Sequence, residues 1–291
     1  MMVRADSQIR LADGRLLGYS EYGMPTGTPA LFCHGWPGSR VEGQLFGPAA
    51  ALLGVRLIAP DRPGVGLSDG QPRRSLARWA ADAAALADAL NLDRFAVLGV
   101  SGGGPHALAC AYSLPQRVTC AIVAAGIGPL DTPGADEDLD PAARLSFTLA
   151  RRAPRLAEWI IAQTFAQARR DSDAYLGRVA ASVPPQDRAA LAQADVRAAL
   201  AASLDEAFRQ GCQSVAQELE LFSQPWGFAL EQVGVPVYLF HGEADASVPV
   251  SMGRRQAVRL PRCTPRFYPD EAHFSLLVNR AADILRPALG A

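Results

Sequence analysis

Short apolar segments alternate with helical ones in the first half of the chain, and this alternation constrains the possible fold most. Residues 55–59, 95–100 and 118–125 have the length and hydrophobicity of strands. Residues 76–90 repeat leucine, tryptophan and alanine at spacings of three and four, which is typical of an amphipathic helix. A second helix is expected over residues 105–113. This strand–helix–strand–helix–strand order predicts a parallel sheet with helices on both faces.

Local signals indicate where these elements begin and end. An Asp-Gly pair within residues 8–23 predicts a hairpin of two strands. Ser75 is suited to cap the first helix, because its hydroxyl can accept from a free N–H in the first turn. Pro105 falls in the first turn of the second helix, where a missing N–H costs nothing. Further strands are predicted at residues 30–33, 235–240 and 266–268.

The alternation stops in the middle of the chain, where residues 128–226 contain no convincing strand. A final helix is expected over residues 276–289. We therefore divide the chain into an α/β core domain, residues 1–127 and 227–291, and a helical cap, residues 128–226. An insertion at this place is typical of a lid over a site, although an ordinary helical subdomain has the same pattern. The helical segments of the cap are residues 145–150, 156–165, 188–202 and 214–222.

All 28 basic residues are arginine, since the chain contains no lysine. This excludes Schiff-base chemistry, a pyridoxal phosphate anchor, a phosphate-loop lysine and a Ser–Lys hydrolase. Heavy use of arginine and alanine is typical of GC-rich bacterial genomes. The formal net charge of −1 and the absence of a basic tract argue against a nucleic-acid partner.

Cysteine usage and hydrophobicity bear on the compartment. The five cysteines are scattered, with no C-x-x-C pair and no histidine at ligand spacing, so we expect neither a disulfide framework nor a metal site. We also expect no cofactor. No apolar stretch approaches the roughly 18 residues needed to span a bilayer, and residues 1–11 lack the apolar segment of a signal peptide. These patterns predict a cytoplasmic protein with no membrane partner that acts on a small molecule.

Residues 99–103, Gly-Val-Ser-Gly-Gly, lie directly after a predicted strand and directly before a predicted helix. This is the context of a nucleophile elbow, a sharp turn that lifts the Ser101 hydroxyl above the sheet. Glycine is needed at positions 99 and 103, because a side chain there would clash with neighbouring backbone. The nearby helix N-terminus favours developing negative charge. A glycine-rich phosphate loop has a similar pattern, but this chain has no lysine to serve it.

Five sequence blocks, taken together and in this order, are far more specific than the elbow alone. They begin at His34 (His-Gly-Trp-Pro-Gly), Asp61 (Asp-Arg-Pro-Gly-Val-Gly-Leu-Ser), Gly99 (the elbow), His241 (His-Gly-Glu-Ala-Asp) and Ala272 (Ala-His-Phe). The chain resembles the α/β-hydrolase superfamily, specifically the serine hydrolases with a helical cap. The resemblance covers nearly the whole chain and implies a mostly parallel central sheet flanked by helices. Haloalkane dehalogenases and epoxide hydrolases share this architecture but carry an aspartate at the elbow, so Ser101 disfavours both activities.

A serine hydroxyl needs a base, and histidine is the usual one because its pKa of about 6.5 lets it take and return a proton. The chain has four histidines. His34 and His241 each end a strand in a His-Gly pair, which shapes strand ends in the family, and His106 lies in the helix after the elbow. This leaves His273, in a loop after the last predicted strand, as the candidate base.

The imidazole in turn needs a carboxylate that holds its tautomer. Asp245 follows the strand predicted at residues 235–240, and the order Ser, Asp, His is that of the superfamily. Some members take the acid from an earlier loop, which makes Asp131 the alternative. Asp270 and Glu271 are closer to His273 in sequence, but a neighbour in a tight loop rarely reaches the ring productively.

The resemblance also implies two backbone N–H groups that hold the oxyanion, those of Gly102 and Trp36. The Trp36 side chain either forms a wall of the acyl pocket or only packs. The turn over residues 61–68 is scaffolding in the family, and Arg62 is expected to pair with Asp61 or a neighbour rather than to act in catalysis.

Together these residues predict a carboxylesterase-like serine hydrolase that cleaves an ester-like bond in a small apolar molecule through an acyl-enzyme. The same three residues serve C–C hydrolases, lyases and cofactor-free perhydrolases, and a hydrolase-fold ligand receptor would also keep them. An apolar pocket beneath the cap is the expected binding site. The aromatic side chains available for it are Phe147, Trp159, Phe165, Phe222, Trp226 and Phe228.

Overall fold

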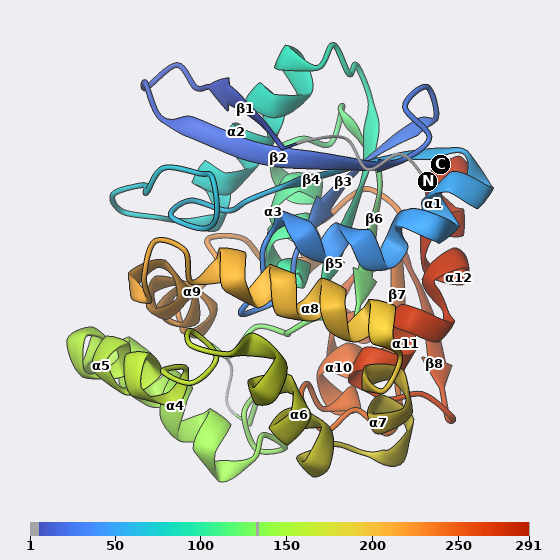
Figure 1. Cartoon of the computed structure of the whole chain (residues 1–291). Coiled ribbons are helices and arrows are strands. Elements are labelled where there is room, and N and C mark those ends of the chain that lie inside the picture. Colours follow the sequence, from blue (N-terminus) through green and yellow to red (C-terminus); the bar gives the residue numbers. More distant parts are fainter. Residues whose placement is uncertain (1–5, 132–133, 291) are drawn as a thin grey trace.

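The central sheet is mostly parallel. The computed structural model describes residues 6–131 and 134–290, and within them it contains eight strands in the order β1-β2-β4-β3-β5-β6-β7-β8 (Figure 1). β2 pairs antiparallel with β1 and β4, while every other neighbouring pair is parallel. The predicted mostly parallel sheet is therefore confirmed. The strands are β1 (Ser7–Arg10), β2 (Leu16–Gly23), β3 (Thr28–Cys33), β4 (Val55–Pro60), β5 (Phe95–Val100), β6 (Val118–Ala124), β7 (Val237–Gly242) and β8 (Cys263–Tyr268).

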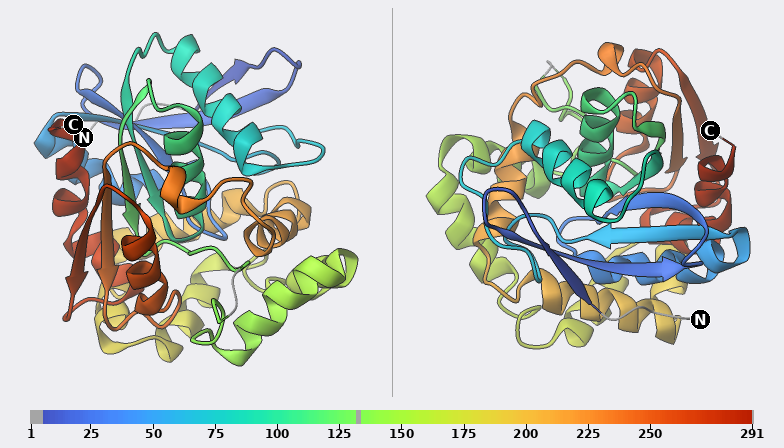
Figure 2. Two further views of the ribbon diagram at one scale, coloured as in Figure 1. Left: turned by 180° about the vertical axis from the view of Figure 1, so that it is seen from behind. Right: turned by 90° about the horizontal axis from the view of Figure 1, so that it is seen from above.

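Helices cover both faces of this sheet, as Figure 2 shows from two further sides. One apolar core lies beneath α2 and α3, and the other lies beneath α1 and α12. Leu31 belongs to the first core and Phe32 to the second, because successive strand residues point to opposite faces. The α-helices of the core domain are α1 (Gly47–Leu53), α2 (Leu76–Ala89), α3 (Gly104–Ser113), α10 (Val250–Arg259), α11 (His273–Asn279) and α12 (Ala281–Leu285). Its short 3-10 turns are η1 (Arg40–Phe46), η2 (Ser101–Gly103), η3 (Leu230–Gln232) and η4 (Arg286–Leu289).

The local signals act as expected at the ends of α2 and α3. The Ser75 hydroxyl accepts a hydrogen bond from the Arg78 N–H at 3.2 Å and so caps α2. Asn91, just beyond α2, has a φ of 55°, a left-handed conformation that asparagine tolerates. Pro105 lies in the first turn of α3. Capping chemistry therefore accounts for the agreement at these boundaries.

Among the described residues between β6 and β7 there are six α-helices, and we call them the insertion. They are α4 (Pro141–Arg152), α5 (Pro154–Thr164), α6 (Ser172–Ser182), α7 (Pro185–Leu191), α8 (Ala194–Ala207) and α9 (Gln213–Ser223). Figure 1 shows them on one side of the sheet, with α8 between the sheet and the outer helices. Among the described residues, no helix combines the length and hydrophobicity needed to cross a bilayer.

The sequence does not predict α1 and α10, and it differs from the structure in three further helical segments. The helix expected over residues 188–202 is two helices, α7 and α8, because α7 packs on α11 while α8 packs on η1. Helix α6 was not predicted, since only Ser172 and Leu176 of it are buried and its apolar pattern is weak. The helix expected over residues 276–289 is three elements. α11 begins earlier, at His273, and α12 follows it after Arg280. The last element, η4, is a 3-10 turn that contains Pro287, which has no N–H to continue an α-helix.

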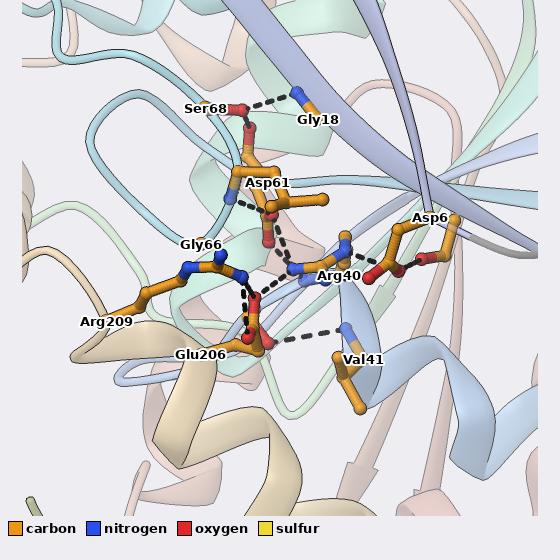
Figure 3. Close-up of polar contacts among 12 residues, drawn as sticks. Asp6, Gly18, Arg40, Val41, Asp61, Gly66, Ser68, Glu206 and Arg209 are labelled. Atoms are coloured by element: carbon orange, nitrogen blue, oxygen red, sulfur yellow. Dashed lines mark hydrogen bonds and ion pairs between the residues drawn. The ribbon is translucent and has the colours of Figure 1, made fainter.

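Buried ion pairs join the insertion to the core. Arg40 of η1 contacts Asp61 at 2.9 Å, after β4, and Glu206 of α8 at 2.5 Å (Figure 3). The guanidinium also contacts Asp6 at 2.5 Å, so three carboxylates surround one buried cation. Beside this network, the Ser39 N–H donates to the Ser203 hydroxyl of α8 at 3.0 Å. Helix α8 is therefore attached to the core by buried polar groups as well as by packing.

Candidate active site

The strand–helix turn after β5 holds Ser101 in a strained conformation. Its φ is 50°, in the left-handed region that costs a non-glycine residue about 1–3 kcal/mol. A side chain on Gly99 would collide with the Gly103 carbonyl, and one on Gly103 would collide with the Cys33 carbonyl. The tight turn thus needs both glycines, as the sequence predicts. It turns Ser101 toward a cavity at the carboxyl ends of the parallel strands.

His273 and Asp245 meet at the same end of the sheet. The His273 Nδ1–H donates to Asp245 Oδ2 at 2.8 Å, across 28 positions of the chain. His273 is the first residue of α11, not a residue of the preceding loop as the sequence suggested. Ser101 and His273 line one cavity. Because Nδ1 is engaged by the carboxylate, Nε2 is the ring nitrogen left to act as a base.

The pair is electrostatically coupled. Burial disfavours the charged imidazolium, but the Asp245 carboxylate more than offsets this, so the pKa of His273 is raised. Burial likewise opposes ionisation of Asp245, but the imidazole of His273 and a contact with His241 hold its pKa well below the ordinary range. Asp245 is therefore a carboxylate that stabilises positive charge on His273.

Backbone groups fix the orientation of Asp245. Its Oδ1 accepts hydrogen bonds from the N–H groups of Ser247 at 2.9 Å and Val248 at 2.8 Å. The alternative acid, Asp131, is exposed, while His273 bonds to Asp245. Asp270 and Glu271 instead form ion pairs with Arg280 at 2.9 and 2.8 Å. The structure thus brings Asp245, and not its competitors, to the ring.

The other three histidines have structural partners and are buried. His34 Nδ1 bonds to the Gly35 carbonyl, and its Nε2 accepts from the Arg62 N–H. His106 Nδ1 bonds to the Gly102 carbonyl. Burial lowers the pKa of His34 and of His106 well below 6.5, so both rings stay neutral. His241 donates to the Val248 carbonyl at 2.8 Å.

The two residues expected to supply the oxyanion donors, Trp36 and Gly102, lie against each other. A Cβ on Gly102 would stand 2.7 Å from the Cβ of Trp36, so only glycine permits this approach. The Gly102 N–H is in the first turn of a helix, where N–H groups have no intrahelical partner. The Trp36 indole donates to the Val215 carbonyl of α9 at 2.8 Å and meets Phe165 edge-on. Trp36 therefore both packs and lines the cavity.

Arg62 holds the backbone that leads into Trp36, at His34 and Gly35, a role that the sequence did not reveal. Asp61, one of the partners expected for Arg62, pairs with Arg40 instead. Arg62 forms its ion pair with Glu218 of α9. Its Nη2 donates to the Gly35 carbonyl at 2.9 Å, and its Nη1 donates to the His34 carbonyl. Both residues of the pair are fully buried. Sequence reasoning could not find Glu218, because it lies 156 positions from Arg62.

Asp187 is a second residue of the insertion that sequence reasoning missed. Its carboxylate accepts from the His273 N–H at 3.1 Å and from the Ser275 N–H at 2.8 Å. These are free N–H groups at the start of α11, where a negative charge is favourable. Asp187 is fully buried in α7, and its charge helps to raise the pKa of His273. The insertion therefore fixes the backbone of the candidate base.

The cavity between the sheet and the insertion has a volume of about 350 Å³. Of the six aromatic residues that the sequence makes available for it, Phe147 and Phe165 line the cavity. Trp159 is exposed, and Phe222 is buried in a neighbouring cluster. Trp226 and Phe228 pack against each other instead, Trp226 within the apolar core under α2 and α3 and Phe228 at its edge. The apolar walls also include Ile127, Leu139, Leu176, Val179, Leu200, Leu204, Leu219, Val248, Met252, Phe274 and Leu277.

A family model for the alpha/beta hydrolase fold matches residues 28–280. The chain belongs to the alpha/beta hydrolase fold family. The match spans the elbow, both members of the His273–Asp245 pair and the whole insertion.

Related proteins of this α/β-hydrolase include two non-heme chloroperoxidases. The one from Burkholderia pyrrocinia is 28% identical over 288 residues, which cover 93% of each chain. The one from Streptomyces lividans is 36% identical over 125 residues, which cover 42% of this chain and only 45% of that protein. In that second match, less than half of the relative's length is spanned.

Solved structures share the fold over the full chain. A bromoperoxidase from Bacillus anthracis has a TM-score of 0.72 at 21% identity, covering 99% of this chain and 100% of that one. An esterase from Rhodococcus sp. ECU1013 has a TM-score of 0.68 at 22% identity, covering 100% and 99%. At these identities the likeness shows the fold alone, while the family and its relatives support a hydrolase.

Within the described residues, the α/β-hydrolase has no cluster of three or more histidine, cysteine, aspartate or glutamate side chains that could hold a metal. All five cysteines are free thiols. Burial raises the pKa of Cys33 to about 12, so this thiol beside the elbow is not nucleophilic. Ser101, Ser146, Ser203 and Ser247 all bring hydroxyl groups to the cavity, and of these four Ser101 is the one with a left-handed φ, on the turn between β5 and α3.

Proposed function

We propose that this α/β-hydrolase is a serine esterase that cleaves small, largely apolar esters through an acyl-enzyme. The observation that carries the proposal is the 2.8 Å hydrogen bond from His273 Nδ1 to Asp245, at a cavity that Ser101 also lines. In the proposed roles, Ser101 is the nucleophile, His273 the general base and Asp245 the carboxylate that orients the ring.

The proposed reaction proceeds in two halves. His273 Nε2 takes the proton of Ser101 while the serine oxygen attacks the ester carbonyl carbon. The N–H groups of Trp36 and Gly102 then hold the negative oxygen, and each such donor is worth roughly 100- to 1000-fold in rate. His273 returns the proton to the leaving alcohol, and a water molecule, activated in the same way, releases the acid from Ser101.

The proposed cap role of residues 128–226 is supported by the lining of the cavity. Phe147, Phe165, Tyr175 and Leu204 of the insertion face Ser101 across a space of about 350 Å³. Such a volume suits a small molecule, and the apolar walls favour an apolar acyl or alcohol group. We propose that the insertion sizes the substrate. A cytoplasmic location, in keeping with five free thiols, remains part of the proposal.

A fluorophosphonate probe tests the proposal directly, because it labels only an activated serine. We expect one adduct, on Ser101, together with turnover of short p-nitrophenyl esters. Labelling of Ser101 without ester turnover would redirect the assignment to C–C cleavage, lyase chemistry or ligand reception. No adduct would mean that Ser101 is not activated, and the proposal would fail.

Perhydrolysis is the second candidate, and the similarity to the non-heme chloroperoxidase from Burkholderia pyrrocinia over 93% of each chain favours it. The same acyl-enzyme would be attacked by hydrogen peroxide instead of water, giving a peracid. We test it by supplying acetate and hydrogen peroxide and measuring halide oxidation by the peracid. Halide oxidation that depends on Ser101, faster than ester hydrolysis, would favour this candidate over the esterase.

A further inference from the structure

Glu42 is a buried carboxyl group within the cavity that the proposed reaction does not use. It lies on η1 and lines the cavity together with Ser101 and His273. Its Oε2 accepts a hydrogen bond from the Gly35 N–H at 2.6 Å. Gly35 directly precedes Trp36, whose N–H is a proposed oxyanion donor. Across residues 6–131 and 134–290, the carboxyl makes no other hydrogen bond. One oxygen is therefore held by backbone while the group as a whole faces the substrate space.

The His-Gly-Trp-Pro-Gly turn is shaped around this carboxyl. A Cβ on Gly38 would lie 2.7 Å from Glu42 Oε2, and one on Gly35 would lie 3.1 Å from Oε1. The first distance is shorter than real Cβ contacts, so a side chain at position 38 would displace the Glu42 carboxyl from this place. Glu42 thus lines the cavity beside Gly35 and Trp36.

The described lining of the cavity contains no arginine to balance this group. The ionisable side chains of its described lining are Glu42, Tyr175 and His273. The charge of Arg62 lowers the pKa of Glu42, but Arg62 lies outside the cavity lining, is fully buried and forms an ion pair with Glu218. His273 needs to be neutral to act as a base. An anionic substrate would therefore find a carboxyl group in the cavity and no opposing arginine.

We propose that Glu42 is the specificity-determining residue of the cavity, which donates a hydrogen bond to an uncharged polar group of the substrate and excludes ester anions. The inference rests on the proposed ester hydrolysis and adds the class of ester. A protonated Glu42 can accept from Gly35 N–H with one oxygen and donate into the cavity with the other. An ionised Glu42 repels a substrate carboxylate at close range.

The pKa of Glu42 supports this assignment. Burial raises it to about 7, although the Gly35 N–H and the charges of Arg62 and His273 oppose the shift. Below this pH the group is mostly neutral, and above it mostly ionised. Exclusion of anions therefore becomes stronger as the pH rises through about 7.

A matched pair of substrates isolates this effect from the rest of the reaction. Dimethyl succinate is uncharged, whereas monomethyl succinate has the same chain and one carboxylate, ionised above its ordinary pKa of about 4–5. We measure kcat/KM for both from methanol release between pH 6 and 8. Titration of His273 affects both substrates alike, so it cancels in the ratio of the neutral to the anionic ester.

In the wild type we expect this ratio to rise by up to about tenfold from pH 6 to pH 8, the limit for a group with a pKa near 7. Glu42→Gln keeps an acceptor for the Gly35 N–H but cannot ionise, so its ratio is expected to be flat. Asp187→Asn, which removes a buried charge near His273 but outside the cavity lining, should keep the rise. If Glu42 has only a structural role, Glu42→Gln would lower kcat/KM for both esters, and the ratio would not change with pH in either protein.

A flat ratio in the wild type, or the same rise in Glu42→Gln, overturns the inference. The wild-type profile decides the matter even if the variant fails to fold. If neither ester is hydrolysed, fluorophosphonate labelling and p-nitrophenyl ester turnover still decide the proposed function separately. In that case the dissociation constants of the two compounds for Ser101→Ala, measured by ligand-observed NMR over the same pH range, test Glu42 by the same ratio.

Discussion

Ser101 combines a strained backbone with a hydroxyl that faces a largely apolar cavity. The left-handed φ of 50° persists because Gly99 and Gly103 allow the turn to close against neighbouring carbonyl groups. Strain of this kind is typical of sites where one atom must be held at a fixed place. The cost in stability is offset by the buried strand and helix on either side of the turn.

Ser101→Ala should lower ester turnover by at least about 1000-fold while leaving the protein folded, because removal of the nucleophile leaves only binding and oxyanion stabilisation. Steady-state kinetics and a thermal melt check both halves of this prediction. Ser113→Ala, at the exposed end of the following helix, is the matched control. Turnover at the wild-type level in Ser101→Ala would contradict the assigned nucleophile.

The pH dependence of kcat/KM should report the ionisation of His273. The ring must be neutral to accept a proton, and the Asp245 carboxylate raises its pKa above the ordinary value of about 6.5. The rate is therefore expected to fall as the pH falls through a value above 6.5. A profile that stays flat down to pH 5 would contradict a histidine base.

Residues of the site differ in how far sequence could predict them. Ser101 is signalled by its glycine spacing, and the proposed partners Asp245 and His273 by their place after predicted strands. Glu42 and Asp187 carry no such signal, because their roles depend on contacts between distant segments. Asp187, for example, reaches an N–H group that lies 86 positions later in the chain.

At the scale of elements, the sheet follows from the sequence and the insertion follows only in part. Strand β5 occupies the predicted residues 95–100, since an apolar run followed by a glycine turn has few alternatives. The break between α7 and α8 has no glycine or proline to mark it, and it arises from packing on two different partners. Periodicity describes the faces of a helix, but it does not tell which neighbours will bend or divide it.

Contact between α7 and α11 predicts that the insertion tunes the candidate base. Asp187→Asn replaces one acceptor oxygen with a donor and removes a negative charge that raises the pKa of His273. The acid limb of kcat/KM should therefore move to lower pH, with a reduced kcat. Asp195→Asn, at an exposed site in the first turn of α8, should leave the limb in place. An unshifted limb in Asp187→Asn would argue against this coupling.

The ion pair between Arg62 and α9 should dominate the attachment of that helix. Glu218→Gln leaves two arginines, Arg62 and Arg74, without their buried counter-charge. Breaking such a pair typically costs about 3–5 kcal/mol. Urea denaturation should show a loss of this size, whereas Glu220→Gln on the same helix should change stability little. Equal stability of the two variants would show that solvent or rearrangement replaces the pair.

At the scale of the whole molecule, the insertion has an inner and an outer part. Helices α8 and α9 are joined to the core through Arg40, Arg62 and Trp36. Helices α4, α5 and α6 lie farther from the sheet (Figure 1), and α5 exposes Trp159. If any part of the insertion opens over the cavity, the outer part is the one with fewer buried polar attachments to break.

Hydrogen exchange tests this division. Amides of α4, α5 and α6 should exchange faster than those of α8 and α9, because local opening follows the density of buried contacts. Covalent labelling of Ser101 should slow exchange in α4 and α6, whose Phe147 and Tyr175 line the cavity. Uniform protection across all six helices would indicate a rigid insertion.

The buried ion pairs across the insertion also limit how this α/β-hydrolase can be recombined with its relatives. A chimaera that exchanges residues 128–226 for another insertion would remove Glu206, Glu218 and Asp187 together. Arg40 and Arg62 would then remain in the core as buried cations, and α11 would lose its N-terminal acceptor. A transplanted insertion must therefore bring three carboxylates in register, so the insertion of this protein cannot be exchanged as an independent module.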